Sequence, residues 1–249
     1  MFTLYFAPDT CALASHIALE HVGAQYEAVH VDFSRNEQRS ANYLRLNPKG
    51  RVPALVTDRG ILTETPAILM FICQTYPGAG LAPLEDKFAL AQMNAFNSYL
   101  CSTVHVAHAH RMRGHRWVDD PTAIAAMQKK APQAVGECFD LIERDFFQGP
   151  WVLGEGYTVS DMYLFTLAQW LEADGVDPGR FPKVSRHRRR MSQHPVVSKV
   201  VAAERSASKL SLGIERGSYL SAQVTPKPAV ERTRRFTAST WRGSIRRAG

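Results

Sequence analysis

Cys11 is the side chain of this sequence best suited to chemistry. It follows the loop 8–10 after a short strand pattern, at the point where a helical pattern begins. Free backbone N–H groups and the positive end of a helix dipole favour the reactive thiolate at such a position. A buried structural cysteine is the alternative, because unpaired cysteines are commonly buried. Position alone leaves both interpretations open.

Glu64 and Thr65 form a second candidate pair, at the junction between a short strand and the start of a helix. A carboxylate, a hydroxyl and free N–H groups at a helix N-terminus suit a zwitterionic ligand. A plain helix cap by Thr65 or Thr63, with Pro66 in the first turn, explains the same residues. The local sequence favours the cap, and the two interpretations are compatible.

Three histidines, His105, His108 and His110, lie within one long helical pattern. His105 and His108 share a face of that helix because they are three residues apart. A metal site would need further ligands from other segments, and the chain has no HExxH motif. Its four cysteines form no CxxC pair and match no zinc spacing, so we expect no metal and reduced thiols.

Two further motifs are predicted to be structural. Thr158 and Asp161 have the spacing of a helix capping box that precedes an apolar run. The basic run 186–190 stands at the end of a predicted helix, where cations complement the dipole, and we interpret it as a solvated face.

The charge of the chain is concentrated at its C-terminal end. The formal net charge is +7 over 249 residues. Residues 205–249 contain ten Lys and Arg but only two acids, which leaves residues 1–204 with a net charge of −1. The positive charge therefore belongs to a basic tail, which we expect to be disordered. We do not expect a nucleic-acid partner on the strength of that tail alone.

The first eighty residues alternate short strand and helix patterns, in the order βαβ-α-ββα. A βαβ start requires parallel strands, and the turn at 58–60 makes the later pair an antiparallel hairpin. We therefore predict an α/β domain with a mixed sheet. The expected elements are strands 3–6, 26–33, 52–56 and 61–63 and helices 11–22, 40–46 and 64–76.

The second half of the chain has helical patterns only. We predict a first domain at 1–77, a linker at 78–85, an all-helical domain at 86–204 and the tail at 205–249. The expected helices cover 86–113, 121–146, 160–173, 181–190 and 195–204. No apolar stretch approaches the roughly 18 residues that span a bilayer, and the start does not resemble a signal peptide, so we expect a cytoplasmic protein without membrane contact.

Four segments together resemble the glutathione transferases, most closely the bacterial beta class. The similarity runs from residue 1 to residue 204, and it lies in the order and the distances of the segments. They are LYFAPDTCAL at 4–13, NPKGRVPAL at 47–55, LTET at 62–65 and TVSDMYLF at 158–165.

The resemblance implies a thioredoxin-like N-terminal domain, an all-α C-terminal domain, a homodimer, and glutathione as co-substrate. By position, Cys11 and His105 correspond to the beta-class active-site cysteine and histidine. By the same resemblance, the backbone of Val52, before a cis Pro53, would pair with the cysteinyl part of glutathione. Glu64 and Thr65 would hold the γ-glutamyl carboxylate and amine, and Arg51 would supply a cation for the glycyl carboxylate.

This chain also departs from the beta-class pattern. Phe6 stands where a tyrosine is frequent, Asn36 stands in place of a lysine, and Arg51 stands in place of a glutamine. Thr65 retains the hydroxyl of the usual serine, although Pro66 follows it. Arg51 restores the positive charge that Asn36 lacks.

These observations predict transfer of the glutathione thiolate to a small hydrophobic electrophile. Two alternatives remain open. Cys11 could form a mixed disulfide that a second glutathione resolves, since no CxxC partner is present. The departures at Phe6 and Asn36 also fit a non-catalytic protein that binds glutathione or another ligand on this fold.

Overall fold

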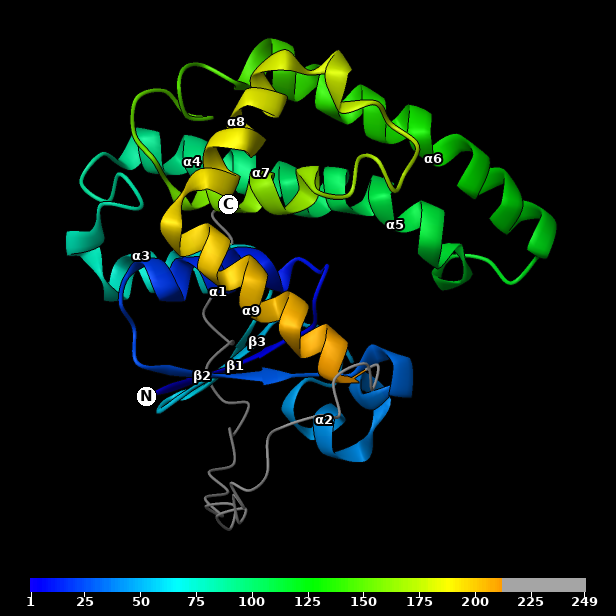
Figure 1. Cartoon of the computed structure of the whole chain (residues 1–249), viewed down its shortest axis with the longest axis horizontal. Coiled ribbons are helices and arrows are strands. Elements are labelled where there is room, and N and C mark those ends of the chain that lie inside the picture. The colour runs from blue at the N-terminus through cyan, green and yellow to red at the C-terminus, as the bar shows by residue number, and fades with distance from the viewer. Residues whose placement is uncertain (212–249) are drawn as a thin grey trace, which may run out of the picture. The chain divides into compact units, whose positions relative to one another are not determined.

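The computed structural model describes residues 1–211. The N-terminal part of the chain is an α/β unit (Figure 1). The sheet has the order β2-β1-β3-β4, with β1 parallel to β2 and antiparallel to β3, and with β3 antiparallel to β4. The predicted mixed sheet and the order βαβ-α-ββα are confirmed. The elements are β1 (Phe2–Phe6), α1 (Ala12–His21), β2 (Tyr26–His30), α2 (Ala41–Leu46), β3 (Ala54–Thr57), β4 (Gly60–Thr63) and α3 (Thr65–Thr75).

Local sequence explains most of these boundaries. Gly23 follows α1 with a φ of +64°, a left-handed conformation that glycine adopts without a Cβ clash. Ser40 caps α2 through its hydroxyl, which accepts a hydrogen bond from the Tyr43 N–H at 3.1 Å. β3 begins at Ala54 rather than at residue 52, because the Val52–Pro53 peptide bond is cis and proline has no N–H to donate to the sheet.

The rest of the described chain is helical. The predicted continuous helix 86–113 is interrupted by a π-helical turn, Leu100–Val104, which joins α4 to α5. A similar turn, Ile142–Phe146, continues α6. The helices are α4 (Lys87–Tyr99), α5 (His105–Arg113), α6 (Pro121–Leu141), α7 (Val159–Ala168), α8 (Pro182–Gln193) and α9 (Pro195–Ser211).

The capping box at the start of α7 is confirmed, and it is part of the core. Thr158 caps the helix, and the Asp161 carboxylate accepts the Thr158 N–H at 2.9 Å. The fully buried Asp161 also accepts the Val152 N–H at 2.9 Å and lies 3.1 Å from the His187 ring nitrogen Nε2. These partners satisfy a carboxylate that would otherwise be buried at a large cost, so Asp161 is structural.

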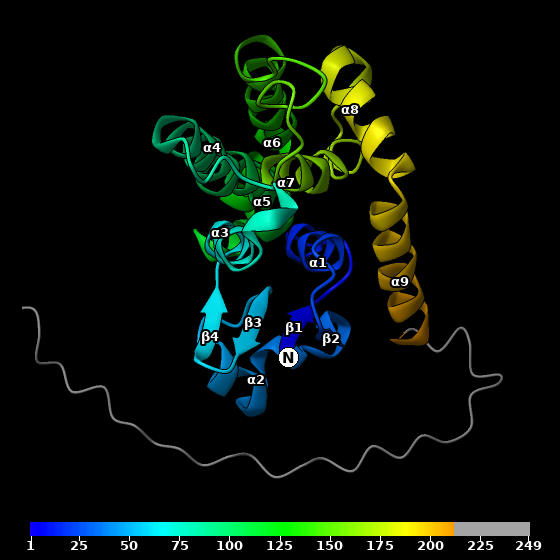
Figure 2. The same cartoon turned by 90° about the vertical axis from the view of Figure 1, so that its left-hand side faces the viewer.

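A single core runs from the sheet into the helical part. Figure 2 shows α1 and α3 between the strands and helices α4–α7, and α1 packs against both α3 and α7. Helix α9 passes back over α1 (Figures 1 and 2), where the buried His16 ring meets Glu204 at 2.8 Å. The described residues therefore form one compact unit, in which helical-domain side chains can contribute to a site on the α/β domain.

Helix α9 differs from expectation at its C-terminal end. It continues to Ser211, seven residues past the predicted end at 204. The Ser206 hydroxyl donates to the Ala202 carbonyl at 3.1 Å within it. The rest of the predicted tail, 212–249, lies outside the described residues, and the domain boundaries at 77 and 86 stay predictions. Among the helices of residues 1–211, none is long and apolar enough to cross a membrane.

Candidate functional site

Cys11 lies at the N-cap position of α1, as predicted, but it is buried. Its thiol donates to the Val52 carbonyl at 3.6 Å, and the Thr65 hydroxyl donates to the Cys11 carbonyl at 3.5 Å. Cys11 thus joins three segments that are distant in sequence: the start of α1, the cis-proline loop and the start of α3.

Burial sets the protonation state of this cysteine. Desolvation raises the pKa of the Cys11 thiol to about 11, although the Thr65 hydroxyl and the charge of Arg113 act to lower it. The expectation of a thiolate at the helix N-terminus is therefore not met in the protein alone, because loss of hydration outweighs the helix dipole. Cys11 is a neutral thiol that can donate a hydrogen bond.

Side-chain hydrogen bonds to the Arg51 carbonyl fix the conformation of the cis-proline loop. The Arg51 carbonyl accepts hydrogen bonds from the Tyr43 hydroxyl at 2.8 Å and from the Asn47 amide at 2.6 Å. Gly50 has a φ of +59°, and a Cβ placed there would lie 2.9 Å from the Gln38 carbonyl oxygen. Glycine is therefore required at the turn that presents Val52 to the thiol of Cys11.

Glu64 and Thr65 are also positioned by backbone geometry. Glu64 has a φ of +72°, which a non-glycine residue rarely adopts and which is typical of functional sites. The predicted cap by Thr65 or Thr63 is wrong, because Glu64 occupies the N-cap position of α3 and no side chain caps the helix. The Thr65 hydroxyl instead faces the Cys11 carbonyl.

Lys49 was missed by the sequence analysis, and it completes this corner of the site. Its ammonium group donates to the Glu64 carboxylate at 2.5 Å and to the Thr63 hydroxyl at 2.7 Å. The first turn of α3, which contains Pro66, therefore presents free N–H groups beside a carboxylate, a hydroxyl and a lysine. Donors and acceptors of both signs suit a ligand with an ammonium and a carboxylate on one carbon.

His105 begins α5, directly after the π-helical turn, and its ring packs against Trp170 at 5.2 Å between centroids. Burial, together with the charges of Arg113, Arg116 and Arg51, lowers the pKa of His105 to about 4. The imidazole is therefore neutral at physiological pH, with one nitrogen able to donate and the other able to accept.

The neighbouring histidines have different environments. His108 is a core residue, since its Nδ1 contacts the buried carboxylate of Asp174. His110 packs against Trp117 at 4.5 Å. Within residues 1–211, no three His, Cys, Asp or Glu side chains come together as a metal site would require.

The charge of Arg113 acts on both Cys11 and His105, although no sequence motif indicated it. Arg113 ends α5, eight residues after His105, so the helix that supplies the histidine also supplies the arginine. That spacing of about two turns is the one sequence signal that could have identified it.

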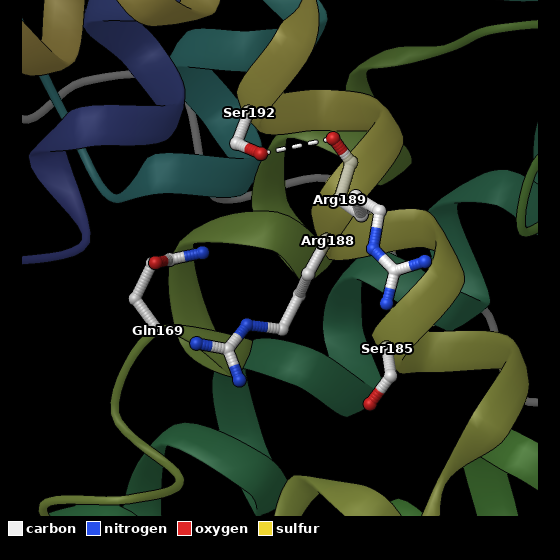
Figure 3. A pocket seen from close by; sticks show the side chains of 5 residues that line it. All are labelled: Gln169, Ser185, Arg188, Arg189 and Ser192. Atoms are coloured by element: carbon white, nitrogen blue, oxygen red, sulfur yellow. Dashed lines mark hydrogen bonds between the residues drawn. The ribbon is translucent and has the colours of Figure 1, made fainter.

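The basic run in α8 lines a separate hollow of about 220 Å³ (Figure 3). Arg188 pairs there with the Glu172 carboxylate at 3.0 Å, and the Ser192 hydroxyl donates to the Arg189 carbonyl at 2.9 Å. This hollow shares no lining residue with the site around Cys11.

Comparisons with known proteins agree with this geometry. Residues 1–74 match the family model of the glutathione S-transferase N-terminal domain, and residues 105–195 match that of the C-terminal domain. The glutathione S-transferase GstA of Escherichia coli O157:H7 is 27% identical over 203 residues, covering 81% of this chain and 98% of its own.

Solved structures extend the similarity to the whole fold. A glutathione transferase homologue from Sulfitobacter, crystallised with bound glutathione, is 42% identical, covers 84% of this chain and 98% of its own, and has a TM-score of 0.78. The beta-class glutathione S-transferase of Sphingomonas chungbukensis is 31% identical, covers 81% of this chain and 98% of its own, and has a TM-score of 0.71. With both family domains matched in order on a mixed-sheet α/β unit and a helical unit, this chain belongs to the glutathione S-transferase family.

Proposed function

We propose that this protein binds glutathione and transfers its thiolate sulfur to a small electrophile. The observation that carries the proposal is the convergence of Cys11, the cis-proline loop and the start of α3 within direct hydrogen-bonding contact. The Sulfitobacter homologue with bound glutathione supports it from outside the chain.

The site offers a partner for each part of the tripeptide. The α3 N-terminus with Thr65 suits the γ-glutamyl carboxylate, and the Glu64 carboxylate suits its ammonium group. The Val52 carbonyl and N–H suit the extended cysteinyl backbone, since the cis Pro53 that follows holds that residue outside the sheet. Arg51 suits the glycyl carboxylate.

Activation of the thiol then falls to hydrogen-bond donors. Free thiols have a pKa of about 8.5, so stabilising the thiolate by two pKa units makes most of it reactive at neutral pH. On binding, the Cys11 thiol would turn from the Val52 carbonyl and donate to the glutathione sulfur. The proton that leaves the glutathione thiol would pass to solvent, because an imidazole with a pKa of about 4 is too weak a base to hold it. The neutral His105 would instead donate its ring N–H to the thiolate.

A redox function is the less favoured alternative. Its nucleophile would be a Cys11 thiolate, and a pKa of about 11 leaves little thiolate at neutral pH. The same thiol serves well as a donor, which is the role that conjugation requires.

Replacement of Cys11 by alanine separates the two activities. We expect Cys11→Ala to retain conjugation of glutathione to 1-chloro-2,4-dinitrobenzene within about tenfold, since one donor contributes about 0.5–1.5 kcal/mol. Glutathione-dependent reduction of hydroxyethyl disulfide is expected to be negligible in the wild type and in the variant. Cys138→Ala, which removes a buried cysteine of α6, is the matched control.

Two results would contradict the proposal. Disulfide reduction by the wild type that is lost in Cys11→Ala would assign Cys11 to redox chemistry. Retention of the wild type on immobilised glutathione without turnover of either compound would indicate a non-catalytic binding protein.

A further inference from the structure

The proposed function gives a partner to each part of glutathione but no role to Lys49. This lysine lies in the turn between α2 and β3, three residues before Val52. Its ammonium group donates to the Thr63 hydroxyl at 2.7 Å and to the Glu64 atom Oε1 at 2.5 Å. One cation therefore ties the cis-proline loop to the last residue of β4 and to the N-cap of α3.

The backbone on both sides of this contact is fixed. The amide side chain of the buried Asn47 accepts the Lys49 N–H at 3.2 Å and donates to the Arg51 carbonyl at 2.6 Å. Glu64 has a φ of +72°, a conformation that persists in a non-glycine residue only where its surroundings impose it. Lys49 and Glu64 thus extend towards each other from two constrained segments.

The Glu64 side chain has far less support than its backbone. It is 56% exposed, and Lys49 is the sole hydrogen-bond donor to its carboxylate among residues 1–211. A glutamate side chain without a partner samples several rotamers, and ordering it on binding weakens the affinity for a ligand. The two hydrogen bonds of Lys49 order this carboxylate before a ligand arrives.

Stability does not explain the ion pair, because pairs as exposed as this one contribute little to the free energy of unfolding. Its geometry instead leaves half of the carboxylate available. Lys49 contacts Oε1, whereas Oε2 of Glu64 accepts no hydrogen bond from the described part of the chain. An ammonium group of a ligand can therefore bind Oε2 without displacing the lysine.

We propose that Lys49 is a positioning residue for glutathione, which holds the Glu64 carboxylate by Oε1 so that Oε2 meets the γ-glutamyl ammonium group. This inference rests on the proposed function, and it names the residue that prepares the site for the free amino group of its substrate. Within residues 1–211, no hydrogen bond joins Lys49 to Cys11 or His105. Its effect should therefore fall on glutathione binding and not on the chemical step.

The positive charge of Lys49 alone would have the opposite effect on the ammonium group. A lysine near the γ-glutamyl group repels its ammonium and attracts its carboxylate. If Lys49 acted only as a charge, its removal would strengthen the contribution of the ammonium group to binding. If Lys49 positions Glu64, its removal weakens that contribution, so the sign of the change decides between the two.

A pair of ligands isolates this contribution. Glutathione and its desamino analogue, glutaryl-Cys-Gly, differ only in the γ-glutamyl ammonium group. The ratio of their Kd values, measured by isothermal titration calorimetry, reports what that group adds to binding. We expect the wild type to bind glutathione about tenfold or more tightly than the analogue, as charge-assisted hydrogen bonds do. Glu64→Gln should bring the ratio close to one.

Lys49→Met keeps the length of the side chain and removes its ammonium group. We expect this variant to lower the Kd ratio by about threefold to tenfold, the effect of leaving one long side chain to be ordered on binding. Lys49→Arg retains a cation and its donors, so its ratio should stay within about twofold of the wild type. Lys199→Met, which breaks the ion pair with Glu20 on another face, is the matched control.

Steady-state kinetics separate positioning from a structural role. With 1-chloro-2,4-dinitrobenzene as acceptor, Lys49→Met should raise the KM for glutathione by about threefold to tenfold and leave kcat within about twofold. A structural role would lower kcat as well and would shift the urea midpoint, which we expect to stay close to that of the wild type.

Each failure has its own signature. A Kd ratio that is near one in the wild type, or that is unchanged or larger in Lys49→Met, overturns the positioning role and leaves the proposed function standing. So does a Lys49→Arg variant as impaired as Lys49→Met, because a cation at this position then fails to suffice. A wild type that binds neither ligand overturns the proposed function and the positioning role together.

Discussion

At the scale of single residues, the thiol of Cys11 and the imidazole of His105 are both uncharged in the protein without ligand. Burial raises the pKa of the first to about 11 and lowers that of the second to about 4. Motif position identifies such residues, but it does not determine their protonation, because the covering side chains come from distant segments. Cys11 is covered by the cis-proline loop and α3, and His105 by Trp170.

The lowered pKa of His105 predicts how stability depends on pH. In the unfolded chain a histidine has a pKa of about 6.5, so between about pH 6.5 and pH 4 the unfolded state binds a proton that the folded state does not. The contribution of His105 to stability is therefore complete above about pH 6.5 and declines as the pH falls towards about 4. His105→Gln should lose this dependence.

Urea unfolding at about pH 7 and about pH 5 checks this prediction. The wild-type midpoint should fall more between the two than that of His105→Gln, and His115→Gln, at an exposed histidine, should behave like the wild type. Equal falls in the wild type and His105→Gln would show that His105 is not the titrating group. The comparison between variants removes the contribution of other groups, such as Glu204, whose pKa is raised by burial.

At the scale of elements, most of the fold could be predicted because its signals are local. Gly23 ends α1, the turn at Asp58 makes the β3–β4 hairpin, and the Thr158 box starts α7. The π-helical turn before His105 could not be predicted, since residues 86–113 have a helical pattern throughout. Arg113 was missed for a related reason, because its effect on Cys11 depends on how α5 packs over the α/β domain.

Helix α9 packs against α1 of the α/β domain, and a buried ion pair joins the two helices. Glu204 and His16 meet at 2.8 Å with side chains only 4% and 5% exposed. Glu204→Ala leaves the His16 ring nitrogen buried without a partner, and we expect it to lower the free energy of unfolding by about 1–3 kcal/mol. Lys199, also on α9, forms a more exposed ion pair with Glu20 of α1. We expect Lys199→Ala to lower the free energy of unfolding by only about 0–1 kcal/mol.

Chemical denaturation of the two variants measures the difference. A loss for Glu204→Ala no larger than that for Lys199→Ala would show that the buried pair does not hold α9 to α1. Glu204→Gln keeps a hydrogen-bonding group at the same position, so it should be more stable than Glu204→Ala. That result would show that the lost hydrogen bond, and not only lost packing, destabilises Glu204→Ala.

At the scale of the whole molecule, the positive charge and the site belong to different parts of the chain. Residues 212–249 carry eight Lys and Arg and two Glu, which is nearly all of the net charge of +7. Every contact described at the site, and the His16–Glu204 contact between α1 and α9, lies within residues 1–204. The family domains also end before this segment, at residue 195.

A chain that ends at Ser211 should therefore keep the proposed conjugating activity and lose only its basic character. We expect kcat/KM for glutathione and 1-chloro-2,4-dinitrobenzene to stay within about twofold of the full chain, because no described contact of the site is removed. Elution from a cation-exchange column should need much less salt, since screening of about six net charges governs retention. If the shorter chain also loses activity while its urea midpoint is unchanged, the segment 212–249 acts on the site itself.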